Sequence, residues 1–311
     1  MTPTCRLWIS VAAILFTLLS LWMAGDALYA YRIRSRSKAL GVRRASTLPL
    51  SLNPSGSPAL LLVHGFADGP SVFAKLAPTL AQAGFAVHAM HLSGFGIPAT
   101  EMKGISLDIW RTDIDREINA LQAAAPQRPV WLVGHSLGGA LVFDAALRPT
   151  NHVAGLILLA PLIEPSNARS PLLTSRQWFT ILSRSLLFST IVESRLPADL
   201  HDPTVRAQYR TDRFIHRDIY RALFATIDAI ANRAADWRGP LLMVVSPSDQ
   251  IVDTEASTRF FFAATQASPA KLAEHHSGGH VLPLDVGHEL IAAKMVRFIL
   301  ADSPTERMTG Q

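Results

Sequence analysis

The segment VWLVGHSLGGALVF, residues 130–143, constrains the fold of this chain more than any other stretch. Its first apolar run predicts a buried strand, and its second predicts a helix from Leu137. Between them Ser136 lies in a turn flanked by Gly134 and Gly138, which carry no side chain to collide where the backbone folds back. A serine between a strand and a helix N-terminus is the pattern of an exposed nucleophile. A phosphate-binding turn is disfavoured, because the segment contains neither the Lys-Ser/Thr pair of a P-loop nor G-x-G-x-x-G.

Short apolar strands alternate with helices on both sides of this turn. We expect strands at residues 59–63, 86–91, 130–133, 153–159, 241–245 and 271–274. We expect helices at residues 72–83, 107–124, 137–147, 255–264 and 286–300. This alternation predicts an α/β fold, with a mostly parallel sheet covered by helices on both faces. The alternation stops between about 162 and 236, where aromatic and basic residues follow a helical pattern, so we expect a helical insertion that covers a site.

A serine nucleophile requires a general base and an acid that orients the base. Asp249 follows the expected strand at 241–245, and His280 lies in a glycine-containing loop before the last helix. Together with Ser136 they occur in the chain order Ser, Asp, His, and all three follow expected strands. Asp253 is a second candidate for the acid, although we expect it to cap the next helix.

Other polar residues near these loops have simpler expected roles. We expect Asp285 to cap the last helix. His275 and His276 lie nearer the end of a strand and are expected to be satisfied or exposed histidines. Because no further ligands occur at a suitable spacing, the sequence predicts no metal site, and we expect no cofactor.

The oxyanion of an acyl transfer requires nearby hydrogen-bond donors. The first expected strand ends in His64-Gly65-Phe66. We therefore expect the backbone N–H groups of Phe66 and Leu137 to form the oxyanion hole. We expect His64 to hold this loop and the ring of Phe66 to line an acyl pocket.

Five motifs share one order and approximate spacing: LLLVHGF, HLSGFGIPATE, GHSLGG, SPSDQIV and SGGHVLPLD. In this set the chain resembles the α/β-hydrolase superfamily, and more closely its bacterial carboxylesterase and monoacylglycerol lipase branch. The resemblance covers roughly residues 58–301. It implies an α/β-hydrolase fold with a small helical cap after the sixth strand. It also implies Ser136 as nucleophile, His280 as base and Asp249 as orienting acid.

The stretch from Leu7 to Gly25 contains no charged residue and is about long enough to cross a hydrocarbon core of roughly 30 Å as a helix. Trp8 and Trp22 lie near its ends, as in an interfacial aromatic belt. A cleaved signal peptide is the alternative, with Gly25 and Ala27 as the small residues at the cut, but the apolar stretch is long for one. We therefore expect an uncleaved membrane anchor.

Basic residues are concentrated directly after this stretch. Residues 1–44 carry seven Lys/Arg and one Asp, a net charge of +6, which leaves −1 for the rest of the chain. The sequence pI of 9.7 is therefore a membrane-proximal feature and no sign of nucleic-acid binding. The positive-inside rule predicts a single-pass membrane protein with its catalytic domain in the cytoplasm. A periplasmic domain stays open, because this orientation depends on one charge rule.

The expected organisation is an anchor at residues 1–31, a basic and Ser/Pro-rich linker at 32–57, a hydrolase domain at 58–303 and a tail at 304–311. The cap insertion lies at about 162–236. The only cysteine, Cys5, excludes an intramolecular disulfide. No feature of the sequence indicates an oligomeric state.

These residues favour a serine hydrolase that cleaves carboxylic esters through an acyl-enzyme on Ser136. A lipophilic ester, such as a monoglyceride or lysolipid, would suit an enzyme held at a membrane. An acyltransferase that uses the same acyl-enzyme remains an alternative, since His280 and Asp285 form H-x-x-x-x-D. A non-catalytic, membrane-tethered scaffold is the third possibility, but its expected signature is the loss of Ser136, Asp249 or His280.

Overall fold

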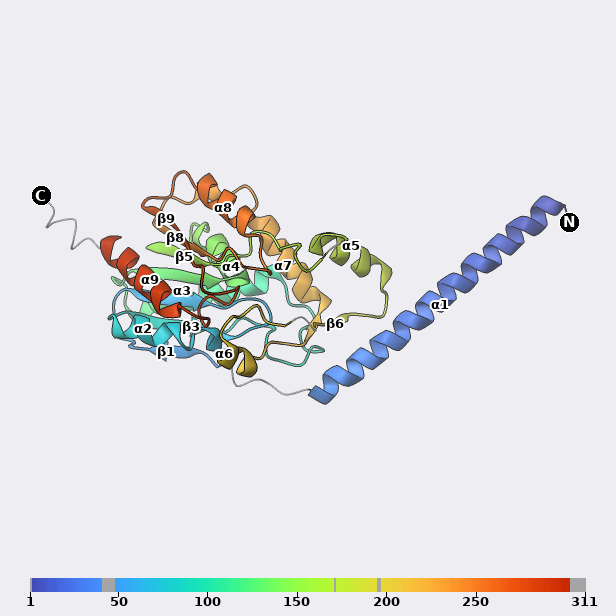
Figure 1. The fold of residues 1–311 in the computed structure, drawn as a ribbon, viewed down its shortest axis with the longest axis horizontal. Helices are drawn as coiled ribbons and strands as arrows, with labels where there is room; N and C mark the ends of the chain where they lie inside the picture. The colour runs from blue at the N-terminus through green and yellow to red at the C-terminus, as the bar shows by residue number, and fades with distance from the viewer. Residues whose placement is uncertain (1, 41–47, 171, 195–196, 303–311) are drawn as a thin grey trace, which may run out of the picture.

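A computed structural model describes residues 2–40, 48–170, 172–194 and 197–302 (Figure 1). Its main sheet has seven strands in the order β1-β3-β2-β4-β5-β8-β9. The strands are β1 (Leu50–Leu52), β2 (Ala59–Val63), β3 (Ala86–Met90), β4 (Val130–His135), β5 (Gly155–Leu159), β8 (Leu241–Val245) and β9 (Ala270–Glu274). Strand β1 is antiparallel to β3, and the other neighbours are parallel. The expected α/β-hydrolase fold is confirmed.

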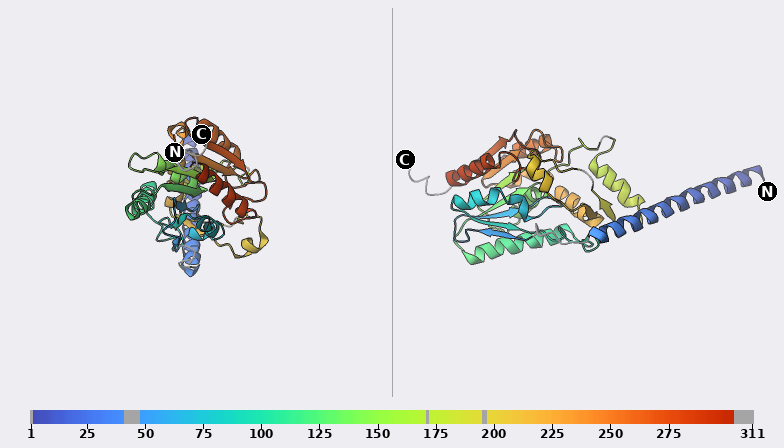
Figure 2. Two further views of the ribbon diagram at one scale, coloured as in Figure 1. Left: turned by 90° about the vertical axis from the view of Figure 1, so that its left-hand side faces the viewer. Right: turned by 60° about the horizontal axis from the view of Figure 1, so that its bottom comes forward.

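Helices cover both faces of this sheet. Helix α2 (Leu76–Gln82) packs against α9 (His288–Asp302), and α3 (Leu107–Ala124) lies on the opposite face (Figure 2). Helix α4 (Leu137–Ala146) packs against α3, and α8 (Thr254–Ala263) packs along β8. A 3-10 helix, η2 (Pro70–Phe73), precedes α2. The helix expected over 72–83 is thus divided in two.

The central strands are buried on both faces, which explains their aliphatic sequences. Every residue of β2, β4, β5 and β8 is buried. The parallel register pairs Val63 at the end of β2 with Gly134 near the end of β4. The loops after these parallel strands therefore open at one edge of the sheet, where ligands bind in open α/β sheets.

The insertion between β5 and β8 was expected to be helical, but only part of it is. It contains the helices α5 (Ser175–Ser185), α6 (Pro203–Gln208) and α7 (Arg217–Ile230), and a 3-10 turn, η3 (Ala234–Asp236). It also contains an antiparallel pair of strands, β6 (Ile191–Glu193) and β7 (Phe214–His216). Strands of three residues are too short to show a period, and β7 runs directly into α7, so its apolar residues continue the helical pattern.

The N-terminal helix is longer than the expected anchor. Helix α1 (Pro3–Leu40) runs without a break through residues 32–40, which were expected to belong to the linker. These residues include Arg, Lys, Ala and Leu and no glycine or proline, so their intrinsic preference is helical. The apolar part of α1 projects away from the α/β domain (Figure 1). It is long and apolar enough to cross a membrane, by length and composition.

The expected linker also contains part of the sheet. Strand β1 pairs with β3 through Leu50 and Ala89, and it forms an edge of the main sheet. The Ser/Pro-rich composition concealed it, because a three-residue edge strand carries no extended pattern. Residues 41–47 of this linker and the expected tail at 304–311 lie outside the described residues.

Candidate active site

The turn after β4 holds Ser136 in a conformation that few residues adopt. Ser136 has φ 54° and ψ −119°, so its backbone lies outside the usual regions for a residue with a side chain. A Cβ on Gly134 would lie 2.3 Å from the carbonyl oxygen of Gly138, and a Cβ on Gly138 would lie 2.1 Å from that of Val63. Both glycines are therefore needed for the close approach of strand and helix.

The three residues proposed from the sequence lie together at this edge of the sheet. The Nε2 atom of His280 is 2.9 Å from the hydroxyl oxygen of Ser136. The Nδ1 atom of His280 is 2.7 Å from Oδ2 of Asp249. Because an aspartate carboxylate only accepts hydrogen bonds, Nδ1 donates to Asp249, and Nε2 is left to accept the proton of Ser136. This is the geometry of a nucleophile, a base and an orienting acid.

Asp249 is buried, yet its carboxylate is stabilised in the charged form. Burial by itself would raise the pKa of the Asp249 carboxyl. The charge and hydrogen bond of His280 oppose burial, as do the backbone N–H groups of Ile251 and Val252, which donate to Oδ1 at 2.8 and 2.9 Å. The pKa of Asp249 therefore lies below its ordinary value, and the carboxylate is ready to stabilise a protonated His280.

The two backbone donors expected for the oxyanion hole belong to Leu137, the residue after Ser136, and to Phe66, which follows Gly65 beside Ser136. Leu137 is the first residue of α4, and its N–H is one of the helix N-terminal groups that lack an intrahelical acceptor. Phe66 follows β2, which is paired with β4. Neither N–H has a hydrogen-bond acceptor among the residues that the structure describes. His64 holds this loop, as expected, because its Nδ1 lies 2.9 Å from the Gly65 carbonyl and its Nε2 accepts from Leu92 N–H at 3.1 Å.

His135, the residue before the serine, supports the loop of His280. Its Nε2 donates to the carbonyl of His280 at 3.0 Å, and the two rings lie 5.0 Å apart. Burial, with the charge of His280 as a smaller contribution, lowers the pKa of His135 to about 3. His135 is therefore neutral, and its Nδ1 is buried with no partner in the described part of the chain.

The cap contributes a residue that the sequence analysis missed. Asp199 lies in the cap segment before α6, and its carbonyl accepts from the N–H of His280 at 3.0 Å. Its carboxylate accepts from the N–H of Gln250 at 2.9 Å, directly after Asp249. One cap residue thus connects the loops of the base and the acid. No local pattern marks Asp199, since the contact forms only when the cap folds back over the sheet.

Asp285 was expected to cap the last helix, but it has a different role. Its fully buried carboxylate accepts hydrogen bonds from the backbone N–H groups of Gly279, His201, Asp202 and Val286. It therefore joins the loop of His280 to the cap. The H-x-x-x-x-D spacing is explained by this structural role, because four backbone donors occupy the carboxylate.

The remaining polar residues lie largely where they were expected. Asp253 caps α8 by accepting from Ala256 N–H at 2.9 Å, and of the two candidate acids it is Asp249 that contacts His280. His275 is buried against the carbonyl of Val286, and His276 is exposed beside Glu274. Within the described residues, no group of three or more His, Cys, Asp or Glu could hold a metal ion.

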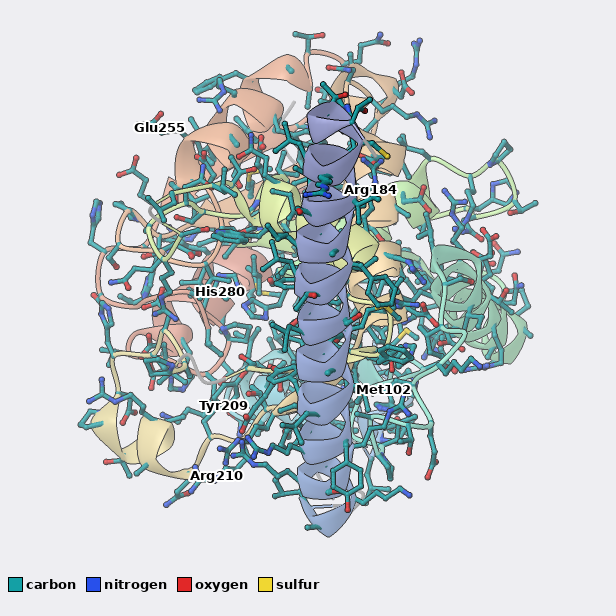
Figure 3. All side chains as sticks on the ribbon, turned by 90° about the vertical axis from the view of Figure 1, so that its right-hand side faces the viewer. Met102, Arg184, Tyr209, Arg210, Glu255 and His280 are labelled. Atoms are coloured by element: carbon teal, nitrogen blue, oxygen red, sulfur yellow. The ribbon has the colours of Figure 1, made fainter. Side chains whose placement is uncertain are left out.

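The cap covers the nucleophile in this conformation. Ser136 is 4% exposed and His280 is 6% exposed. Above them the ring of Phe66 contacts Tyr220 of α7 at 5.2 Å, and Tyr220 contacts Phe179 of α5. A cavity of about 940 Å³ between the end of α1 and the cap is lined by Tyr209 and Arg210 (Figure 3), but Ser136 is not among its lining residues.

Comparison with known proteins identifies the family. The model of the family described as serine aminopeptidase, S33, matches residues 56–286, which include Ser136, Asp249 and His280. The chain belongs to the S33 family of α/β hydrolases.

Two curated relatives and one solved structure illustrate what this S33 hydrolase is similar to. It is 26% identical over 206 residues to monoacylglycerol lipase of Mycolicibacterium smegmatis, an alignment that covers 64% of this chain and 72% of that protein. It is 22% identical over 251 residues to a carboxylesterase of Bacillus subtilis, with 78% of this chain and 93% of the relative covered. The crystal structure of Paleococcus ferrophilus monoacylglycerol lipase matches with a TM-score of 0.68 at 22% identity, covering 82% and 99% of the two chains.

Proposed function

We propose that this S33 hydrolase is a membrane-tethered enzyme that cleaves carboxylic esters through an acyl-enzyme on Ser136. The single observation that carries the proposal is the hydrogen-bonded chain from Ser136 through His280 to Asp249. Ester hydrolysis as the activity is supported by the curated relatives, which are monoacylglycerol lipases and carboxylesterases.

The reaction follows from the positions of these groups. Nε2 of His280 takes the proton of Ser136 as its oxygen attacks the acyl carbonyl, and Asp249 stabilises the protonated imidazole. The N–H groups of Phe66 and Leu137 stabilise the oxyanion, each contributing roughly 3 kcal/mol to the lowering of the barrier. His280 then protonates the departing alcohol. In the second half of the reaction it takes a proton from water, which attacks the acyl-enzyme and releases the acid.

The substrate class is a lipophilic ester, such as a monoglyceride, a lysolipid or another ester with a short-to-medium acyl chain. Aromatic side chains cover the nucleophile, with Phe66, Tyr220 and Phe179 in contact. Aromatic surroundings of this kind favour an acyl chain over a charged peptide. Transfer to an alcohol acceptor has no support from Asp285, whose carboxylate is occupied by backbone N–H groups.

Membrane tethering is supported by the N-terminal helix. The apolar part of α1 is exposed along its length, and the basic residues Arg32, Arg34, Arg36 and Lys38 follow it. Residues of the same helix beyond Gly25 pack on the cap, among them Ile33, which is buried. A helix that belongs to the folded enzyme favours an uncleaved anchor over a signal peptide. The positive-inside rule then favours a cytoplasmic catalytic domain.

Hydrolysis of p-nitrophenyl esters from acetate to palmitate, by the full-length protein in detergent, tests the proposed activity. We expect Ser136→Ala to lower kcat by roughly 10⁴- to 10⁶-fold, because no other group replaces the nucleophile. Ser268→Ala, at an exposed serine before the amino end of β9, is the matched control and should retain full activity. Equal rates for Ser136→Ala and the wild type on every ester would overturn the proposal.

A further inference from the structure

Helix α1 is attached to the cap by a buried carboxylate at the end of its apolar part. Asp26 is 6% exposed and directly follows the uncharged stretch from Leu7 to Gly25. Its Oδ2 accepts from the backbone N–H groups of Leu187 and Phe188 at 2.7 and 2.8 Å. Its Oδ1 accepts from Ser189 N–H at 3.2 Å and from the Ser189 hydroxyl. One carboxylate thus accepts hydrogen bonds from three consecutive backbone N–H groups in the turn between α5 and β6.

Further contacts extend this attachment along α1. Trp22 donates to the carbonyl of Ser185, the last residue of α5, at 3.2 Å. Arg36 forms a two-point ion pair with Glu193 of β6, with nitrogen–oxygen distances of 2.8 and 2.9 Å. The buried residues of this helix are Asp26, Ala30, Ile33 and Ser37. Their spacing of three and four residues places them on one face, so α1 meets the α/β domain along a continuous line.

These contacts fix the depth of the cap relative to a bilayer. Nineteen helical residues from Leu7 to Gly25 span roughly 28 Å, about the thickness of a hydrocarbon core. The boundary of the membrane therefore falls near Trp22 and Asp26, the two residues that contact the end of α5 and the turn after it. In Figure 1 α5 is the part of the α/β domain that lies nearest to the projecting half of α1.

The surface of α5 at this level is apolar. Trp178, Ile181 and Leu182 lie at helical spacing on one face and are 38%, 46% and 41% exposed. In the turn that follows, Leu187 is 60% exposed and Phe188 is 42% exposed. Helix α5 has no buried residue, and its only charged residues are Arg176 and Arg184. Arg176 pairs with Asp228 of α7 at 2.9 Å, so this side of α5 packs on the cap and the apolar face is turned away from it. An amphipathic helix with an exposed face of aromatic and aliphatic residues is typical of a helix lying in a membrane interface.

We propose that Asp26 is a positioning residue that joins the membrane helix to the cap, so that the bilayer surface is the partner of the apolar face of α5. This inference rests on the proposed anchoring of α1. The apolar face defined by Trp178, Ile181, Leu182, Leu187 and Phe188 enters the boundary between headgroups and acyl chains. Phe179, on the inner side of α5, contacts Tyr220, which contacts Phe66 beside the nucleophile. The face of α5 that would meet the bilayer is therefore linked to the residue beside the nucleophile by two ring contacts.

Depth-dependent quenching by lipids tests whether α5 contacts the bilayer in the full-length protein. Single cysteines replace Leu15, Ile181 or Phe262 in a Cys5→Ser background and carry a bimane label. The protein is reconstituted in vesicles of phosphatidylethanolamine and phosphatidylglycerol that contain doxyl-labelled lipids. Position 15 reports on α1 and position 181 on α5, whereas position 262 lies on α8 and is 68% exposed. We expect strong quenching at 15 and 181 and little at 262.

Variants of Asp26 then test whether its attachment of α1 to the cap positions α5 at the bilayer. Asp26→Ala and Asp26→Asn should reduce the quenching at position 181 at least twofold and leave position 15 unchanged. Glu255→Ala is the matched control, because this exposed carboxylate lies on α8, away from α1 (Figure 3), and it should change neither signal. Hydrolysis of p-nitrophenyl acetate in detergent verifies that each variant is folded.

Each other outcome has a definite meaning. Quenching at position 15 without quenching at 181 would overturn the docking of α5 and leave the membrane anchor intact. Absence of quenching at position 15 would overturn the anchor, and the inference with it. Unchanged quenching at 181 in both Asp26 variants would show that Asp26 does not set the depth of the cap.

Discussion

Among single residues, the sequence was sufficient to predict that three side chains far apart in the chain lie together in one site. Ser136, Asp249 and His280 were predicted because each follows a recognisable strand, and parallel strands open their loops at one edge of the sheet. Their supporting residues were not predicted. No role was predicted for His135, since a histidine beside a nucleophile has no local pattern that reveals what it contacts.

The neutral state of His135 leads to a prediction about stability and pH. Its pKa is about 3 in the folded protein and has an ordinary value of 6.5 in the unfolded chain. Between these values the unfolded state binds one more proton, so the free energy of unfolding falls as the pH falls, by roughly 1.4 kcal/mol for each pH unit. His135→Gln cannot take up this proton. From pH 6.5 to 4.5 the wild type should lose about 2–3 kcal/mol more stability than the variant.

Chemical denaturation of the detergent-solubilised protein, followed by tryptophan fluorescence, measures this difference. His276→Gln is the control, because its side chain is 71% exposed, and its pH dependence should follow that of the wild type. If His135→Gln lost stability as steeply as the wild type over this range, His135 would not be the neutral, buried group described above.

At the scale of elements, the strength of the sequence pattern decided what could be predicted. Strands β2 and β8 and helix α3 begin and end at the predicted residues, because each is a long or wholly apolar segment with clear boundaries. Strands β1, β6 and β7 were missed, since three residues show no period. The contact between the cap and the catalytic loops was also missed, because it joins segments far apart in the chain.

That contact predicts that the cap supports catalysis as well as covering the site. Asp199→Ala removes the hydrogen bond to Gln250, beside Asp249, and should let the loops of the acid and the base shift. A small displacement of a catalytic group is costly, so we expect kcat on a short p-nitrophenyl ester to fall by roughly 10- to 100-fold, with KM changed far less.

A second acidic residue of the same cap segment provides the control for this experiment. Asp202 caps α6 and pairs with Lys75 through its side chain, and its carboxylate contacts neither catalytic loop. Asp202→Asn should therefore retain kcat within about twofold. Equal losses in both variants would indicate a general effect on the cap and would contradict the specific role of Asp199.

Over the whole molecule, the sequence separates a basic N-terminal segment from a nearly neutral catalytic domain. The apolar stretch and the basic residues after it were evident from composition. Composition did not reveal that both belong to one helix, which packs on the cap through Asp26 and Ile33. The sequence suggested a linker from residue 32, whereas the helix continues to Leu40, because a change in charge alone does not end a helix. The enzyme is consequently organised as a hydrolase domain whose cap is attached to a long N-terminal helix.

Labelling by a fluorophosphonate, followed by peptide mapping, identifies the nucleophile, which we infer to be Ser136. This reagent phosphonylates a serine that an adjacent base has activated. We expect one adduct per chain, located at Ser136, lost in Ser136→Ala and suppressed by an excess of a monoglyceride. Ester hydrolysis with the adduct at another residue, or with no adduct at all, would contradict this inference.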